Sequence, residues 1–483
     1  MELPRHRTDV IVLGGELAGL FTAALLAKRG LRCKVFGHGE IEGHLAVEGV
    51  LLPELPFLVA DFEASSAVRR VVEDLGLRQD VRRLVPFAAP TLQLIDALHR
   101  LDLHDEEAPR LAELQREFGE AGPPLAALLR GLDDRTTEIA NWIDAAPGLC
   151  ESGFFARRGL NKYLLTASRL ENQGSLWARL PAGSAIAHWL RGLTPYASHV
   201  GDESVSPLLT ERAAARLVLG TRHSTGGERA MLARMARGFI TTHGGEVKPD
   251  SRVARVEMRR SEALIELAGD RTENLATFVV DASRSNWLGA MLAPERAARQ
   301  YATDRAQVLA DDIVVTRHWV LKPAGLPEGI GHKLIVHTAD GRTMLLSVDH
   351  LARPAEGDRS VVEGVSTLSA ACVVHQGQEA DGRRDLCEVV DELLPFCHSH
   401  VVAEHEGRTR QLFRSPEGVT SGAMGPLRPV TTEHARLLRV GSDVLPAWGL
   451  EGELRSALKV ADLIATKLIG RKSQSEVSSP ATA

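Results

Sequence analysis

The chain has 483 residues, of which 44% are hydrophobic and 25% are charged, and its formal net charge is -6. This length predicts at least two domains, and the composition is typical of a soluble globular protein. The acidic balance and the dispersed Lys and Arg residues argue against nucleic-acid binding. The apolar run at the N-terminus is too short for a signal peptide, and no segment has membrane-spanning length, which leaves peripheral membrane contact open. Five scattered cysteines favour a cytoplasmic location.

The N-terminal residues predict a β-α-β unit. The run "DVIVLGG" (9–15) is apolar and β-branched and predicts a buried parallel strand, "LAGLFTAALLAKRG" (17–30) predicts a helix, and "LRCKVFG" (31–37) predicts a second strand. The turn "GGELAG" (14–19) nearly spells the dinucleotide-binding pattern G-x-G-x-x-G, with a glutamate in place of the middle glycine. On this segment alone, a β-α-β crossover that binds nothing explains the pattern equally well.

The next segments predict helices. "SAVRRVVEDLGL" (66–77) and "LQLIDALHRLDL" (92–103) have apolar residues three and four apart, and "LAELQREFGEAGPPLAALL" (111–129) also reads as helical. The region 61–214 is therefore expected to be mainly helical.

Later segments return to strands and turns. Residues 226–258 contain a glycine pair, an amphipathic helix, a second glycine pair and a strand, and residues 276–292 begin with an apolar strand. The runs at 311–321, 332–339 and 343–351 predict an antiparallel sheet. Residues 437–470 predict a strand, a glycine-rich turn and a long helix, and the polar tail 471–483 is expected to be disordered.

In this order, the glycine turn and the segments at 226–258, 276–292 and 437–470 resemble the phytoene desaturase and amine oxidase superfamily of FAD-dependent oxidoreductases. The resemblance spans most of the chain. It implies an α/β fold, in which a Rossmann-like FAD/NAD(P)-binding domain is assembled from residues 1–60, 215–290 and 430–470. Residues 61–214 and 291–429 would form a mixed α+β substrate domain.

The resemblance also implies a set of cofactor-binding residues. Gly14 would allow the tight turn, Gly19 would permit close helix–strand packing, and the backbone of Val253 would contact the adenine. Gly441, Gly449 and Gly452 would place a helix N-terminus against the flavin and its phosphate chain. The complete set is Gly14, Gly15, Gly19, Gly43, Val253, Gly441, Asp443, Gly449 and Gly452.

Three departures lie along the path of this one ligand. Glu16 replaces the second glycine, where its side chain would crowd and repel the pyrophosphate. Gly37 stands where an acidic residue normally holds the ribose, with Glu40 three residues later. In "EGHL" (42–45) only Gly43 remains of a Gly-Gly pair that is normally followed by arginine. FAD is therefore expected to be held weakly or lost.

The sequence indicates no catalytic side chain. Cys397, His398, His400 and His405 lack the second spaced pair of a zinc site, so no metal is expected. Two functions stay open. The first is an FAD-dependent oxidoreductase acting on an apolar or amine-bearing organic substrate, and the second is a non-catalytic relative that serves as a binding or assembly module. Protein partners and oligomeric state are not indicated.

Overall fold

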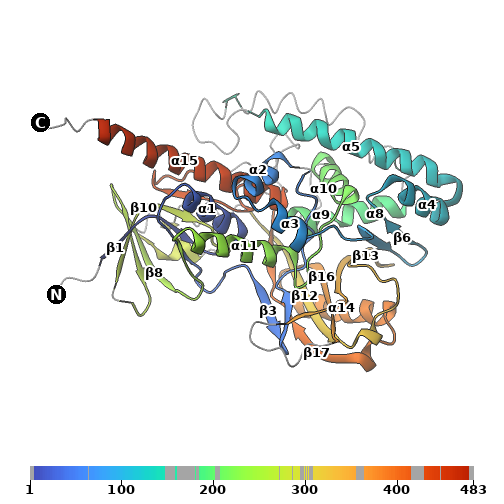
Figure 1. The fold of residues 1–483 in the computed structure, drawn as a ribbon. Helices are drawn as coiled ribbons and strands as arrows, with labels where there is room; N and C mark the ends of the chain where they lie inside the picture. Colours follow the sequence, from blue (N-terminus) through green and yellow to red (C-terminus); the bar gives the residue numbers. More distant parts are fainter. Residues whose placement is uncertain are drawn as a thin grey trace, which may run out of the picture.

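The structure is a computed structural model, and it describes residues 5–63, 65–146, 158–159, 180, 184–201, 207–270, 272–284, 287–293, 298–299, 301, 303, 308–354, 364–414, 429–445 and 448–477. Two sheets, each covered by helices, organise the described part of the chain (Figure 1). Strand β1 begins, and helix α15 ends, at the left of the view.

The first sheet is built from segments far apart in the sequence. Its central strand β1 (Arg5–Leu13) pairs in parallel with β10 (Glu273–Asp281) on one side and with β2 (Cys33–Phe36) on the other. β19 (Leu437–Arg439) also runs parallel to β10. The predicted assembly from discontinuous segments is confirmed. The remaining strands in this sheet are β7 (Glu246–Lys248), β8 (Val253–Met258), β9 (Ala263–Leu267) and β11 (Leu292–Ala293).

Three helices pack on this sheet. Helix α1 (Leu17–Lys28) contacts both α11 (Glu228–Thr242) and α15 (Gly449–Val477), and it is buried along nearly its whole length. The strand residues Val10 to Leu13 are fully buried, as expected for a parallel strand covered on both faces. Helix α15 continues to Val477, so the tail predicted to be disordered from residue 471 is helical in its first part, and residues 478–483 lie outside the described residues.

The second sheet confirms the predicted antiparallel strands. Strand β12 (Leu309–Leu321) pairs antiparallel with β16 (Ser366–His375), which pairs with β14 (Thr343–Asp349). Helix α14 (Glu379–Leu393) packs on β12 and β16. The other strands of this sheet are β5 (Leu92–Ile95), β6 (Arg100–Leu103), β13 (Lys333–His337), β17 (Val401–Glu406) and β18 (Arg410–Phe413). A small third sheet contains β3 (His44–Val47), β4 (Val50–Pro53) and β15 (Arg353–Pro354).

The described residues of the region 61–214 are mainly helical, apart from one hairpin. The helices predicted at 66–77 and 111–129 are confirmed, but the helix predicted at 92–103 is wrong, because these residues form the hairpin β5–β6. Strand β6 alternates polar residues with leucine, β5 reads Leu-Gln-Leu-Ile, and β5 pairs in parallel with β13. The helices here are α2 (Ser66–Asp74), α3 (Arg78–Leu84), α4 (Glu107–Phe118), α5 (Gly122–Asp144), α8 (Ala185–Gly192), α9 (Thr194–Ser198) and α10 (Pro207–Leu219). The 3-10 turn η1 (Gly119–Ala121) also lies in this region. The short helix α12 (Trp287–Met291) and the 3-10 turns η2 (Pro323–Gly325) and η3 (Cys397–His400) lie outside it.

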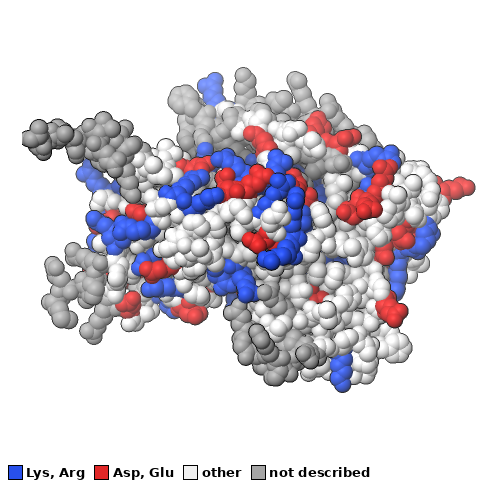
Figure 2. All heavy atoms as spheres, viewed as in Figure 1, with Lys and Arg blue, Asp and Glu red and all other residues white. Residues whose placement is uncertain are grey.

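The charged surface mixes both signs. Figure 2 shows basic and acidic side chains side by side across this face. On α3, for example, Arg78 and Arg82 both pair with Glu63. Among the described residues, no helix combines the length and the apolar character that a membrane span requires.

Candidate dinucleotide-binding site

The turn between β1 and α1 has the tight geometry that its glycines allow. Gly14 has φ +95°, and a Cβ atom there would lie 2.3 Å from the carbonyl oxygen of Ala282. A Cβ atom at Gly19 would lie 2.3 Å from the Cβ of the same Ala282, just beyond β10. Both positions therefore require glycine, so that the turn and α1 can pack against the end of β10.

The space beside Gly15 is filled by the chain itself. A Cβ atom at Gly15 would lie 2.1 Å from Cγ1 of Ile41, and one at Gly37 would lie 2.6 Å from the same atom. The Ile41 side chain therefore packs between the glycine turn and the end of β2. In the superfamily this is the region where the resemblance places the pyrophosphate and the ribose.

Glu42 supplies an anion to the N-terminus of α1. Its Oε2 accepts a hydrogen bond from the backbone N–H of Leu17 at 3.3 Å, and its own N–H donates to the carbonyl oxygen of Gly15 at 2.9 Å. Free amides and the helix dipole make such a helix start a binding place for phosphate. Here a buried carboxylate of the same chain occupies that place.

Arg229 links Glu42 to the C-terminal helix. Its Nε lies 2.5 Å from Oε1 of Glu42, and its Nη2 lies 3.0 Å from both carboxylate oxygens of Glu453. All three side chains are buried, and they come from the loop after β2, the first turn of α11 and the first turn of α15. One guanidinium thus joins three segments that are distant in sequence.

Glu16 belongs to the same cluster of buried charges. Its Oε1 lies 3.0 Å from Nη2 of Arg410 and 3.8 Å from Nε of Arg284. Arg284 also pairs with Glu54 at 2.9 Å, as does the more exposed Arg408 at 2.6 Å. The sequence predicted that Glu16 would repel the pyrophosphate, and in the structure two arginines flank its carboxylate. We call Glu16, Glu42, Glu54, Arg229, Arg284, Arg410 and Glu453 the crevice network.

The two glutamates that depart from the family pattern have opposite pKa shifts. Burial raises the pKa of Glu16 from 4.5 to about 7, which Arg410 and Arg284 only partly oppose. Burial also acts to raise the pKa of Glu42, but Arg229 outweighs it and lowers that pKa to about 2. Glu42 is therefore a firmly ionised anion at neutral pH, whereas Glu16 titrates near neutrality.

The region assigned to the adenine is also in contact with the chain's own residues. The backbone N–H of Val253 donates to Nδ1 of His38 at 3.0 Å. The His38 ring stacks on Trp287, with ring centroids 4.0 Å apart, and the Trp287 indole N–H donates to Glu40 at 3.1 Å. Glu40, three residues beyond the position expected to hold the ribose, thus binds Trp287, and His38 takes up the backbone donor that the resemblance gives to adenine.

The C-terminal glycines are surrounded by protein atoms. Gly441 has φ +133°, and a Cβ atom there would lie 3.2 Å from Oε2 of Glu16 and 3.3 Å from Oδ1 of the buried Asp443. A Cβ atom at Gly449 would lie 2.0 Å from the Ala197 carbonyl oxygen, and one at Gly452 would lie 2.7 Å from that of Leu445. Close packing alone thus requires glycine at 449 and 452.

These contacts provide a test of whether FAD fits. The Leu17 amide is bound to Glu42, Ile41 packs on Gly15, and the Glu16 carboxylate lies beside Gly441. Of the seven glycines that the resemblance places at the cofactor, only Gly43 would accept a Cβ atom without a close contact, since the nearest atom would be 3.9 Å away. As they are arranged, the residues do not fit the pyrophosphate of FAD, because carboxylates of the chain lie where its oxygens would need donors.

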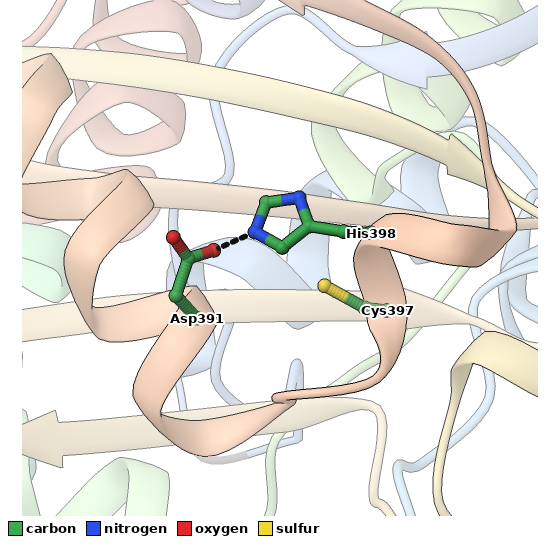
Figure 3. Close-up of side chains that lie close together, drawn as sticks. All are labelled: Asp391, Cys397 and His398. Atoms are coloured by element: carbon green, nitrogen blue, oxygen red, sulfur yellow. Dashed lines mark ion pairs between the residues drawn. The ribbon is translucent and has the colours of Figure 1, made fainter.

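The cysteine and histidine cluster gathers in a different way from the sequence pattern. Cys397 and His398 in η3 meet Asp391 of α14, with the three ligand atoms within 4.8 Å of one another (Figure 3). His405 lies on β17, opposite His318. The His398 ring lies 2.5 Å from Asp391, while burial, Asp391 and Glu404 raise the pKa of the Cys397 thiol. Three potential ligands fall short of the four of a closed structural zinc site, so we assign no metal to these residues.

Sequence reasoning singled out two acids of the crevice network but missed Glu54, Glu453 and the three arginines. Glu16 and Glu42 stood out as departures from a pattern, whereas Arg229, Arg284 and Arg410 lie in ordinary local sequence. The one available signal was physical, since a buried carboxylate requires a cation or a set of donors. That requirement predicts basic partners without indicating their positions.

Comparisons with known proteins identify the fold. No protein-family model and no curated protein matches the sequence. An oxidoreductase from Methanosarcina mazei matches with a TM-score of 0.56 at 13% identity, covering 95% of this chain and 100% of that one. Putrescine oxidase bound to putrescine matches with a TM-score of 0.53 at 16% identity (96% and 100% covered), and cyclohexylamine oxidase from Brevibacterium oxydans with 0.55 at 14% (95% and 99%). The chain has the α/β fold of these proteins, with a Rossmann-like domain and a mixed α+β second domain.

Proposed function

We propose that this chain is a non-catalytic member of the amine oxidase fold, a binding protein whose own residues take the place of FAD. The observation that carries the proposal is the Glu42 carboxylate, which lies on the Leu17 amide at the start of α1 and is held there by Arg229. In this fold that position belongs to a phosphate.

The energetics favour the internal anion over the cofactor. FAD would have to displace Glu42 from Arg229 and bring its phosphates next to Glu16. At an effective dielectric of about 20, two bare like charges about 4 Å apart would repel by roughly 4 kcal/mol; Arg410 and Arg284 beside Glu16 offset part of this repulsion. Moving Glu42 would also leave Arg229 with one buried carboxylate partner in place of two.

A second candidate function is an oxidoreductase that acts on an apolar or amine-bearing substrate with weakly held FAD. One observation favours it. Nη1 of Arg410 is buried and has no hydrogen-bond partner, although it lies in the crevice network. An anion that entered the crevice would satisfy this donor. The fold similarity to putrescine oxidase and cyclohexylamine oxidase is compatible with either candidate.

We place the protein in the cytoplasm under both candidates. The cysteines that the structure describes, at positions 33, 372, 387 and 397, are free thiols. A reducing compartment keeps them so.

Flavin content and turnover test the proposal. The protein is purified without added cofactor, its visible absorption spectrum is recorded, and released flavin is measured after denaturation. Peroxide formation is then assayed with putrescine and with cyclohexylamine in the presence of added FAD. We expect no flavin band and no peroxide above a no-protein control. Stoichiometric flavin, or amine-dependent peroxide, would establish the oxidoreductase instead.

A further inference from the structure

A cavity of about 130 Å³ lies at one edge of the second sheet, between the hairpin β5–β6 and the C-terminal end of α14. Figure 1 shows β6 and β13 at the right of the view, on the opposite side from β1. The strand order places this edge at the far end of the sheet from β12 and β18, and none of the lining residues belongs to the crevice network. A cavity of about this volume has room for a group the size of benzene.

The cavity lies where α14 does not cover the sheet. This helix packs mainly on β12 and β16, and the outer strands carry their own row of side chains on the cavity face. Strand register aligns one residue from each of β6, β5, β13 and β14, namely Asp102, Gln93, Leu334 and Leu346. The other walls are largely apolar and include Ile95, Ile330, Leu393 and Leu394.

Asp102 is held in place at the polar end of the cavity. Its Oδ1 accepts a hydrogen bond from Nε2 of Gln93 at 2.9 Å. Gln93 is itself fixed, because Nε2 also donates to the carbonyl oxygen of Gly329 at 2.9 Å and Oε1 accepts from the Gly331 N–H at 2.7 Å. The second oxygen of Asp102 has no partner among the described residues, so it is a positioned acceptor on the cavity wall.

Arg100 provides the opposite charge on the same strand. It lies two residues before Asp102, on the same face of β6, which places the two Cα atoms about 7 Å apart. Its backbone is fixed, since the N–H donates to Glu117 at 3.2 Å and the carbonyl oxygen accepts from Arg116 at 2.6 Å. Within the described part of the chain, the Arg100 guanidinium forms no ion pair with Asp102 or with the other rim acid, Glu328.

We propose that this cavity binds a free α-amino acid with an apolar side chain, such as leucine. The ammonium group would donate to Asp102, and the carboxylate would accept two parallel hydrogen bonds from the Arg100 guanidinium. The branched alkyl group would pack on Leu334, Leu346 and Leu394. Its four carbons fit a volume that admits about six.

A ligand that carries both charges suits this rim better than a ligand with one. A simple amine leaves Arg100 without a partner, and a fatty acid brings its carboxylate toward Asp102 and Glu328. The end of α14 also favours the ammonium group, because this negative end of the helix has no basic residue in its last turn.

This inference goes beyond the proposed function and does not depend on it. The cavity and the crevice network use different side chains, and amino-acid binding and FAD binding are measured separately. Failure of one therefore leaves the other to be judged on its own result.

Titration of the full-length protein with L-leucine, followed by ligand-observed NMR, tests the proposal. Isoamylamine is leucine without its carboxylate, isocaproate is leucine without its ammonium group, and glycine lacks the alkyl group. Asp102→Asn and Arg100→Met each remove one rim charge, and Leu393→Trp fills the cavity without changing a charge. Asp105→Asn and Arg384→Met are the matched controls, because both side chains are exposed and lie outside the cavity lining.

We expect leucine to bind the wild type, and each of the three analogues to bind at least about tenfold more weakly. Asp102→Asn, Arg100→Met and Leu393→Trp should each weaken leucine binding by about tenfold or more, and the two controls by less than about threefold. Circular dichroism checks that each variant is folded. The proposal is overturned if leucine does not bind, if any analogue binds as tightly as leucine, or if a folded cavity variant binds leucine as the wild type does.

Discussion

Replacing Arg229 with methionine is the sharpest test of the crevice network. Methionine has a similar length and no charge, so the substitution removes the bridge between Glu42 and Glu453 and leaves little empty space. Both carboxylates are buried, and the donors that hold them at 2.5 Å and 3.0 Å would be lost. The variant therefore has two buried acids without their common cation.

The expected loss follows from two independent estimates. Removing one partner of a buried ion pair typically costs about 3–5 kcal/mol of unfolding free energy. The pKa of Glu42 is lowered from 4.5 to about 2, which corresponds to about 3 kcal/mol in favour of the folded state at neutral pH. Because a lowered pKa stabilises the folded state only above the unfolded value, this contribution disappears as the pH falls from 4.5 toward 2. We expect the free energy of unfolding of Arg229→Met to be about 3–5 kcal/mol lower than that of the wild type at pH 7.

Urea unfolding followed by tryptophan fluorescence measures the loss at neutral and acidic pH. Without Arg229, burial raises the pKa of Glu42, so the variant regains stability as acid protonates that carboxyl and the gap to the wild type narrows. Arg408→Met is the matched control, since this arginine side chain is 56% exposed and its ion pair should contribute at most about 1 kcal/mol. A loss below about 1 kcal/mol in Arg229→Met, or a gap that does not change with pH, would refute the reasoning.

Three further predictions concern single positions. Burial raises the pKa of Glu16 to about 7, so this carboxyl ionises more readily in the unfolded chain than in the folded one. The free energy of unfolding of the wild type should therefore fall by up to about 3 kcal/mol between about pH 5 and pH 8. Glu16→Gln should remove most of this slope in urea unfolding, and an unchanged slope would contradict the assignment. Gly14→Ala should lower the free energy of unfolding by about 3 kcal/mol or more, because φ is +95° and the Cβ atom would strike Ala282, while Gly43→Ala should stay within about 0.5 kcal/mol. Equal effects of these two alanines on the urea midpoint would be evidence against the tight turn. Alkylation of the native protein, followed by mass spectrometry, should label the partly exposed Cys387 before Cys33, whose burial raises its pKa to about 12. Faster labelling of Cys33 would show that strand β2 is accessible to the reagent.

The sequence predicted the first sheet well, because its strands are recognisable locally. Buried parallel strands are continuous apolar runs, and β1 and β10 have this character. The hairpin β5–β6 was missed for the opposite reason. Its strands are short, leucines at 92 and 94 are compatible with either period, and the deciding partner β13 lies at residues 333–337.

The candidate site was predictable only where backbone geometry limits the choice of residue. Gly14 and Gly19 follow from the turn and from close packing on Ala282, and both can be read from the motif. The network around Glu42 depends on Arg229 and on Glu453, which are brought near it only by the fold. No local pattern marks such partners, since isolated arginines and glutamates are usually solvated surface residues.

Titration of FAD into the wild type and into the double variant Glu16→Gly, Glu42→Gly tests the central claim most directly. In the double variant, the backbone N–H of Leu17 no longer has a carboxylate to donate to, and Arg229, Arg284 and Arg410 remain to bind a dianion. The surface substitution Glu404→Gln is the control for a change of charge alone. We predict no stoichiometric FAD in the wild type or the control, and binding tighter by about ten- to a thousandfold in the double variant. Tight, stoichiometric FAD in the wild type would contradict the claim that the crevice network takes the place of the cofactor.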